Sequence, residues 1–162
     1  MKYLPILVLS CISIAGCATY PIGKDDLCRE MATFANSTQP GASHMVSLET
    51  SWGSSNIHPG AIVSRDCNPN EYAPGVILCH YLMDNSAAEF AENNYSRAAA
   101  CLANSPTKGR DEANYEDIDA KVSAYGGKGG AFGVRRGIKV TVEFKPNTEH
   151  GTMQLNIRAD AR

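Results

Sequence analysis

Two stretches near the C-terminus alternate between apolar and polar residues, and this pattern restricts the fold more than any other feature of the chain. In residues 137–145 and in residues 152–160 every second side chain is apolar, and residues 146–151 join the two stretches. Strict alternation is typical of antiparallel strands that have one buried and one solvated face. Residues 118–125 repeat the pattern more weakly. The C-terminal third therefore predicts a sheet whose apolar face needs a covering layer.

Two segments predict the helices of that layer. Residues 25–35 place apolar side chains at helical spacing behind two aspartates, which suit the positive N-terminal end of a helix. Residues 86–102 begin with Ser86 and Glu89 at the spacing of a capping box and continue with one stripe of small and apolar residues. We expect Pro106 to end this second helix.

The middle of the chain predicts two further strands. Residues 44–52 alternate, with Trp52 on the face that meets the core, and residues 75–83 are continuously apolar, as a buried strand is. Residues 53–74, between them, are rich in Gly, Ser, Asn and Pro and predict a long loop with a short apolar piece at residues 61–63. The irregular stretch around residues 52–72 is a second possible contact surface. Together the elements predict an α+β domain in which an antiparallel sheet of about four to five strands has two helices packed on one face.

Length and charge fit one domain that does not bind nucleic acid. The chain has 162 residues and a formal net charge of −2. Sequence-independent binding of nucleic acid requires a basic face. We therefore expect a single α+β domain over residues 25–162 and no nucleic-acid partner.

The N-terminal residues have the order of a secretory signal peptide. Lys2 precedes an apolar run over residues 4–14, and two small residues close the segment. The run is short for a membrane span, which takes roughly 20 apolar residues. The stretch Ile14-Ala15-Gly16-Cys17 resembles the bacterial lipobox, an aliphatic residue and two small ones before an obligatory cysteine.

The lipobox resemblance implies a lipid anchor. It implies cleavage after residues 1–16, the signal peptide, then a diacylglyceryl thioether on Cys17, acylation of the new amine, and a short tether over residues 17–24. Ala18 in place of an aspartate favours the outer membrane, with the domain facing the periplasm. The alternative is an ordinary secreted protein that is cut near Ala15.

Four cysteines remain once Cys11 in the leader and Cys17 are set aside. An even number of cysteines in an oxidising compartment predicts disulfides, and the sequence leaves all the possible pairings open. A metal site that also uses His58 and His80 is the alternative, but the chain lacks the tight ligand pairs that zinc sites favour, so no metal is expected. The cysteines expected in disulfides are Cys28, Cys67, Cys79 and Cys101.

The segment 126–137 is rich in glycine and carries several cations. It lacks the G-x-x-x-x-G-K-[ST] pattern of a phosphate-binding loop. One interpretation is a mobile connection between two strands. The other is a flexible cationic loop that recognises acidic groups of a protein partner, with an aromatic side chain as its anchor. Under the second interpretation the partner-binding residues are Lys128, Phe132, Arg135 and Arg136.

The chain has no motif of catalysis. It lacks a G-x-S-x-G elbow and an H-E-x-x-H pattern, so neither enzyme activity nor a cofactor is expected. A lipobox, a short tether and one disulfide-bonded domain resemble, in organisation, the immunity and lysozyme-inhibitor lipoproteins of the bacterial envelope. This resemblance implies a protein that binds and neutralises a periplasm-acting toxin or hydrolase. The alternatives are an accessory lipoprotein of an envelope complex, and a periplasmic hydrolase or ligand carrier.

Overall fold

A computed structural model of the chain describes residues 25–103 and 119–162. The predicted signal peptide, the lipobox cysteine Cys17 and the tether lie outside these residues. The helices and strands follow one another in the order α1 (Asp26–Asn36), β1 (Ser43–Trp52), β2 (Val63–Asn68), α2 (Ala73–Asn85), α3 (Ala91–Leu102), β3 (Ala120–Tyr125), β4 (Ile138–Asn147) and β5 (Thr152–Ala161).

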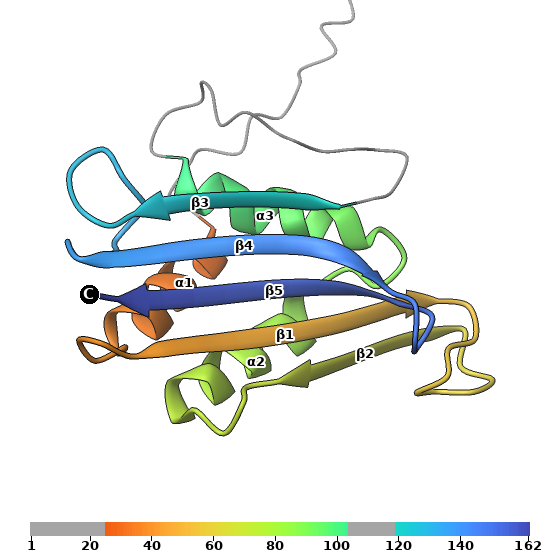
Figure 1. Ribbon diagram of the computed structural model, residues 1–162. Coiled ribbons are helices and arrows are strands. Elements are labelled where there is room, and N and C mark those ends of the chain that lie inside the picture. The colour runs from red at the N-terminus through yellow and green to blue at the C-terminus, as the bar shows by residue number, and fades with distance from the viewer. Residues whose placement is uncertain (1–24, 104–118) are drawn as a thin grey trace, which may run out of the picture.

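The five strands form one antiparallel sheet in the order β2-β1-β5-β4-β3. All three helices lie against the same face of this sheet (Figure 1). The predicted α+β class and the size of the sheet are confirmed, but the covering layer contains three helices where the sequence predicted two. The opposite face of the sheet carries polar side chains, and none of the described elements covers it.

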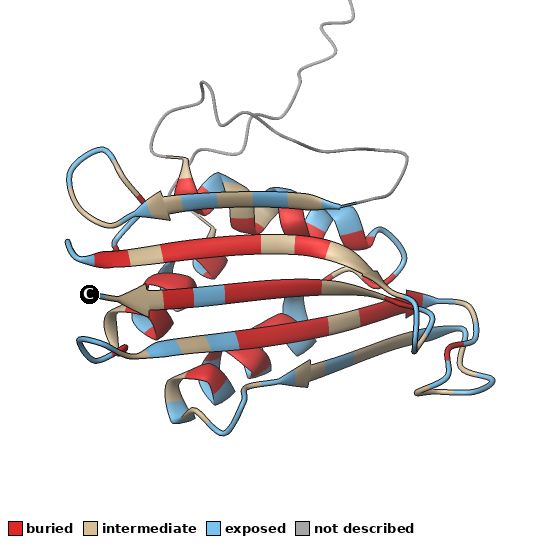
Figure 2. Cartoon of the chain, in the orientation of Figure 1, coloured by how far each residue is buried: buried red, intermediate tan, exposed pale blue. Residues whose placement is uncertain are grey.

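The alternation along β4 and β5 builds the core, as predicted. Val142 of β4 pairs with Ile157 of β5, and Phe144 pairs with Leu155, and all four side chains are buried. Phe34 of α1 is buried in the same cluster. Each such side chain contributes roughly 1.5–3 kcal/mol when it leaves water. Figure 2 shows the buried residues along the central strands and on the helix surfaces that meet them.

The weaker alternation near residue 120 is confirmed as β3. Val122 of β3 pairs with Val142 of β4, which places β3 at one edge of the sheet. Ile118, where the alternation began, and Pro106, the predicted end of a helix, lie outside the described residues.

Residues 75–83, predicted as a buried strand, form the greater part of helix α2. Pro74 lies in the first turn, where its missing N–H is not needed. Leu78 and Leu82, one turn apart, are buried, whereas Ile77 is exposed. The prediction is wrong because the exposed face of the helix is also apolar. A short run that is apolar throughout has no period that separates a helix from a strand.

The predicted capping box at Ser86 and Glu89 is not formed. Ser86 instead ends α2, and its backbone N–H donates to the carbonyl of Leu82 at 3.0 Å. The side chain of Asn94 closes the connection between α2 and α3, because it bonds both the N–H and the carbonyl of Ala87, at 2.9 and 2.6 Å. Helix α3 begins at Ala91, later than the predicted start at residue 86, and the predicted stripe is buried from Ala91 to Leu102.

The segment 53–74, predicted as a loop, contains an edge strand and a crosslink. The edge strand β2 carries few apolar residues, so it gave no alternation to detect. Cys67 of β2 forms a disulfide with Cys79 of α2, and Cys28 of α1 forms one with Cys101 of α3. All four cysteines predicted to form disulfides are therefore paired, and none of them is a free thiolate for a metal.

Candidate functional site

The glycine-rich segment 126–137 joins β3 to β4 and is packed against the domain. Its residues Ala131 and Val134 are buried. The Ala131 N–H donates to the carbonyl of Tyr125 at 3.0 Å, and the Gly127 N–H donates to the carbonyl of Val134 at 2.9 Å. The sequence predicted a mobile or flexible connection. The segment is instead a folded turn that is fastened along most of its length.

The same segment forms hydrogen bonds with the C-terminal ends of two helices. The side-chain amide of Asn36, the last residue of α1, donates to the Gly133 carbonyl at 2.9 Å and accepts from the Arg135 N–H at 2.8 Å. The Phe132 N–H donates to the carbonyl of Cys101 in the last turn of α3, at 2.9 Å. Carbonyls at the C-terminal end of a helix carry partial negative charge, which suits N–H donors and nearby cations. The Phe132 N–H therefore caps α3, whereas α1 is held through the side chain of Asn36.

The four residues predicted to bind a partner have different surroundings. The guanidinium of Arg135 donates to the Thr38 carbonyl at 2.8 Å, so this side chain supports the fold. Lys128, Phe132 and Arg136 are exposed. These three residues remain available for contact with a partner.

Further cations lie at the same end of the sheet. Arg162 donates to the hydroxyl of Tyr125 at 2.8 Å, and its guanidinium lies 5.1 Å from the centre of the Tyr125 ring. Asp160 also lies there, and Arg158 forms an ion pair with it at 2.8 Å. Figure 1 shows the β3–β4 connection and the end of β5 at this edge of the molecule. We call this surface the cationic end and define it as Lys128, Arg135, Arg136, Lys139 and Arg162.

The opposite end of the sheet exposes a tryptophan. Trp52 lies on the same face of β1 as Leu48, as predicted, yet its side chain is 58% exposed whereas Leu48 is 0% exposed. The ten residues of β1 span about 33 Å, whereas the 13 residues of α2 span about 20 Å. The prediction that Trp52 belongs to the core is wrong because the strand extends beyond the helices that the structure describes (Figure 1).

Two aliphatic residues join the tryptophan at this overhang. Trp52 pairs with Val63 across β1 and β2, and Val63 and Ile62 are 43% and 70% exposed. Arg65 lies on the same face of β2 as Val63 and donates to the carbonyl of Met83 in the last turn of α2, at 2.8 Å. This contact marks the place where the helical cover ends. We call Trp52, Ile62 and Val63 the hairpin shelf.

The loop that joins β1 to β2 beside the hairpin shelf is fixed to the neighbouring turn between β4 and β5. The backbone N–H of Asn56 donates to the His150 carbonyl at 2.8 Å, and its side chain donates to the Glu149 carbonyl at 2.7 Å. Within the loop, the His58 N–H donates to the hydroxyl of Ser55 at 3.1 Å. A surface held in place before binding loses less conformational entropy when a partner arrives.

Charged residues of both signs surround the hairpin shelf. Glu149 lies in the turn between β4 and β5, and Glu49 lies on the open face of the sheet. Arg65 lies in β2 beside the shelf, and Lys145 of β4 lies at the register position of Glu49. No single sign of charge therefore characterises this end of the sheet.

Hydrogen-bonded polar side chains connect three strands on the open face of the sheet. The Ser47 hydroxyl donates to Asn156 at 2.6 Å, and the Asn156 amide donates to Gln154 at 3.2 Å. Gln154 and Asn147 both donate to the carboxylate of Glu49, at 3.3 and 2.7 Å. Because these groups satisfy one another, the middle of the open face offers few free donors to a ligand.

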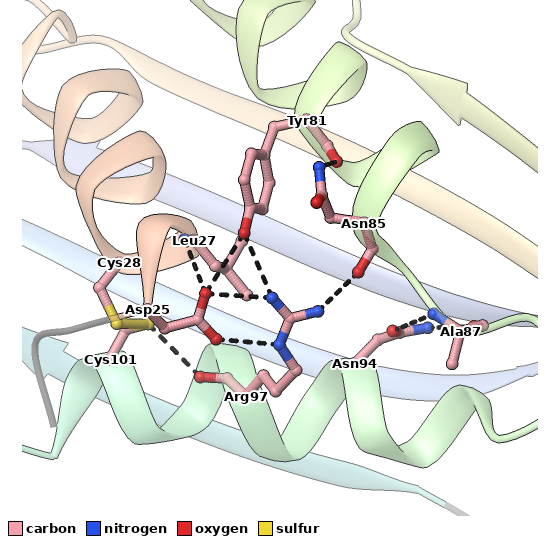
Figure 3. A network of polar contacts seen from close by, with 9 residues as sticks. All are labelled: Asp25, Leu27, Cys28, Tyr81, Asn85, Ala87, Asn94, Arg97 and Cys101. Carbon is pink, nitrogen blue, oxygen red and sulfur yellow. Dashed lines mark hydrogen bonds and ion pairs between the residues drawn. A yellow bond between two sulfur atoms is a disulfide. The ribbon is translucent and has the colours of Figure 1, made fainter. Parts of the chain in front are cut away.

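An ion pair links the three helices (Figure 3). Asp25 caps α1 by accepting from the Leu27 N–H at 2.9 Å. Arg97 of α3 donates to both carboxylate oxygens of Asp25, at 2.9 and 3.0 Å, and to the Asn85 carbonyl at 2.6 Å. The hydroxyl of Tyr81 in α2 donates to Asp25 at 3.3 Å. The arrangement joins the start of α1 to the middle of the other two helices.

These contacts hold the two side chains in their ionised forms. The hydrogen bond from Arg97 lowers the pKa of Asp25 and outweighs partial burial, which acts in the opposite direction. The same hydrogen bond raises the pKa of Arg97. Burial raises the pKa of Tyr81, and the charge of Asp25 raises it further, so the phenol stays protonated. Shifted pKa values also occur in active sites, but here a structural ion pair accounts for them.

The histidines lie on separate elements. His44 stacks on Tyr72 with ring centres 3.6 Å apart, and the Nε2 atom of His58 lies 4.0 Å from the Asp66 carboxylate. Over residues 25–103 and 119–162 no three His, Cys, Asp or Glu side chains are grouped as a metal site requires. No helix in the same two ranges combines the length and the apolar character needed to span a bilayer.

Comparison of the chain with protein-family models, with curated proteins and with solved structures finds no match. The candidate surfaces therefore rest on the geometry of this chain alone.

Proposed function

We propose that the chain is a non-catalytic lipoprotein of the bacterial envelope that binds and neutralises another protein, a toxin or hydrolase that acts in the periplasm. The hairpin shelf is the observation that carries this proposal. Trp52 at the end of β1, Val63 at the start of β2 and the adjoining Ile62 are exposed, and the loop between the two strands is held by hydrogen bonds. Exposed apolar clusters mark interaction surfaces, and tryptophan is enriched among residues that dominate binding energy.

The apolar character of the hairpin shelf defines the kind of partner, because Glu149 and Arg65 leave no single sign of charge beside it. The shelf fits a partner that has an apolar pocket for Trp52. Lipidation at Cys17, implied by the lipobox resemblance, holds the domain at the outer membrane, where it meets such a partner in the periplasm.

The test begins with capture from envelope and secreted fractions of the source bacterium by the tagged protein, with mass spectrometry of what is retained. We expect one secreted protein, held stoichiometrically. The change Trp52→Ala is then expected to weaken its binding by at least about 30-fold, because a central anchor of an interface contributes about 2 kcal/mol or more. The free energy of unfolding should fall by less than about 1 kcal/mol, because Trp52 is mostly exposed.

Ile77→Ala is the matched control for this experiment. Ile77 lies on α2 and is 56% exposed, close to the exposure of Trp52, but it is not part of the hairpin shelf. Binding by Ile77→Ala should equal that of the parent chain. Equal losses of binding by both variants, or full binding by Trp52→Ala, count against the shelf as the contact surface.

The capture experiment also separates the alternative functions. Retention of membrane machinery supports the accessory-subunit alternative, and retention of nothing favours a hydrolase or ligand carrier.

A further inference from the structure

We propose that the cationic end is a docking surface for an anionic phospholipid membrane. The proposal rests on the envelope location in the proposed function, and not on the protein partner. Five cations gather at this end, and the Asp160 carboxylate beside them is paired with Arg158. Partial burial raises the pKa of Asp160, but hydrogen bonds from Ser43 and Arg158 outweigh it and keep that pKa low, so the ion pair persists near neutral pH. The unpaired positive charge is left to meet an external anion.

Two aromatic rings lie among the cations. Tyr125 is 48% exposed and Phe132 is 36% exposed. Aromatic rings beside lysine and arginine are typical of surfaces at the membrane–water boundary, where the rings lie at the level of the headgroups and the cations pair with phosphates. An acidic protein surface also fits cations with an aromatic anchor. The position of the expected lipid anchor on Cys17 is what favours a lipid surface here.

The segment's rigidity supports a planar partner. The turn over residues 126–137 is fastened to α1 through Asn36 and to α3 through the Phe132 N–H. The guanidinium of Arg135 is likewise fixed on Thr38. The cations therefore stand on a preformed surface at the end of the sheet, and docking orders little additional chain.

The expected lipid anchor reaches the same plane. Helix α1 has 11 residues and is about 16 Å long, and it runs from Asp25 toward the cationic end, where Asn36 contacts Gly133. The chain between Cys17 and Asp25 spans at most about 28 Å. A lipid on Cys17 and headgroups under the cationic end therefore fit one membrane. In this orientation the hairpin shelf, at the other end of the strands, projects about 30 Å into the periplasm.

The test is co-sedimentation with lipid vesicles. It uses residues 18–162, which lack both the predicted signal peptide and Cys17, so that no leader or acyl anchor is present and any binding comes from the domain. Vesicles contain phosphatidylcholine with about 30% phosphatidylglycerol, or phosphatidylcholine alone, at low salt. We expect binding to the anionic vesicles only, with loss of binding as salt rises. Lys128→Ala combined with Arg136→Ala should lower the partition coefficient about 10- to 30-fold.

Arg29→Ala combined with Lys121→Ala is the matched control. Both side chains are exposed, lie outside the cationic end, and change the net charge by the same amount. This variant should bind within about threefold of the parent chain. Three results would overturn the proposal. Both double variants could lose binding equally, the parent chain could bind neutral vesicles equally well, or Lys128 and Arg136 could capture an acidic protein while the chain binds no vesicles. Trp52→Ala should leave vesicle binding unchanged, so failure of the protein-binding function is distinguished from failure of this one.

Discussion

Gly130 illustrates how one residue determines the shape of the glycine-rich turn. A Cβ atom at this position would overlap the carbonyl oxygen of Tyr125, the same oxygen that accepts from the Ala131 N–H. Gly129, beside it, has a φ of +81° and open space around it. The two glycines are therefore needed for different reasons, one for close approach of backbone and the other for a left-handed conformation.

Alanine at each position should separate these reasons. Gly130→Ala is expected to lower the free energy of unfolding by about 3 kcal/mol, because backbone must move to admit the methyl group. Gly129→Ala should cost about 1 kcal/mol, the strain of a left-handed alanine in open space. Urea denaturation measures both. If both substitutions lower the free energy of unfolding by the same small amount, the turn is loosely held.

Trp52 marks the limit of sequence reasoning at the residue scale. Alternation placed Trp52 on the core-facing side of β1 together with Leu48, and this is correct. Its burial depends on whether a helix reaches the end of the strand, which is a property of lengths and packing far along the chain. Residues 61–63 stood out as a short apolar piece and residues 52–72 as a possible contact surface, but the sequence did not show that Val63 pairs with Trp52. The cations of the glycine-rich turn were visible in the sequence, but the hydrogen bonds that fasten the turn to α1 and α3 were not.

At the scale of elements, the sequence predicted α1, β1, β4 and β5 because their periods match one covered face. α2 was missed because it is apolar on both faces. Packing explains only some of the apolar residues of α2. Leu78 and Leu82 face the core, whereas Val76 and Ile77 remain exposed. The ion pair between Asp25 and Arg97 had no local signal, since 72 residues separate the two.

This ion pair should make the packing of the three helices sensitive to acid. The pKa of Asp25 is lowered in the folded protein. As the pH falls below about 4, the Asp25 carboxylate therefore takes up a proton in the unfolded chain at a higher pH than in the folded protein. Stability from this pair is therefore present at neutral pH and is lost as the pH falls through the folded pKa. Arg97→Gln should cost about 1–2 kcal/mol at neutral pH, less than a fully buried pair, because both side chains keep some contact with solvent.

The measurement is the free energy of unfolding of both chains at neutral pH and at about pH 3. The gap between the parent chain and Arg97→Gln should narrow in acid. Arg29→Gln is the control, because Arg29 pairs with Asp26 on the exposed surface of α1, so this change should lower the free energy of unfolding much less than Arg97→Gln does. A gap that stays constant with pH would mean that Arg97 acts through its bond to Asn85 and not through the carboxylate.

At the scale of the whole molecule, the two disulfides constrain very different lengths of chain. Cys28 and Cys101 are 73 residues apart, whereas Cys67 and Cys79 are 12 apart. A crosslink removes more entropy from the unfolded chain when it closes a longer loop, and this difference in length corresponds to about 1.5 kcal/mol. The sequence predicted which cysteines form disulfides but not their connectivity, because the connectivity depends on how the helices and the edge strand pack together.

Removal of the two bridges should therefore have different effects on stability and on binding. Cys28→Ala with Cys101→Ala is expected to lower the free energy of unfolding by about 1.5 kcal/mol more than Cys67→Ala with Cys79→Ala, as measured by urea denaturation. Binding of a protein partner should show the reverse order, because Cys67 lies in β2, the strand that carries Val63 of the hairpin shelf. If loss of the Cys28–Cys101 bridge lowered both stability and partner binding more, the shelf would depend on the stability of the whole domain and not on the disulfide between α2 and β2.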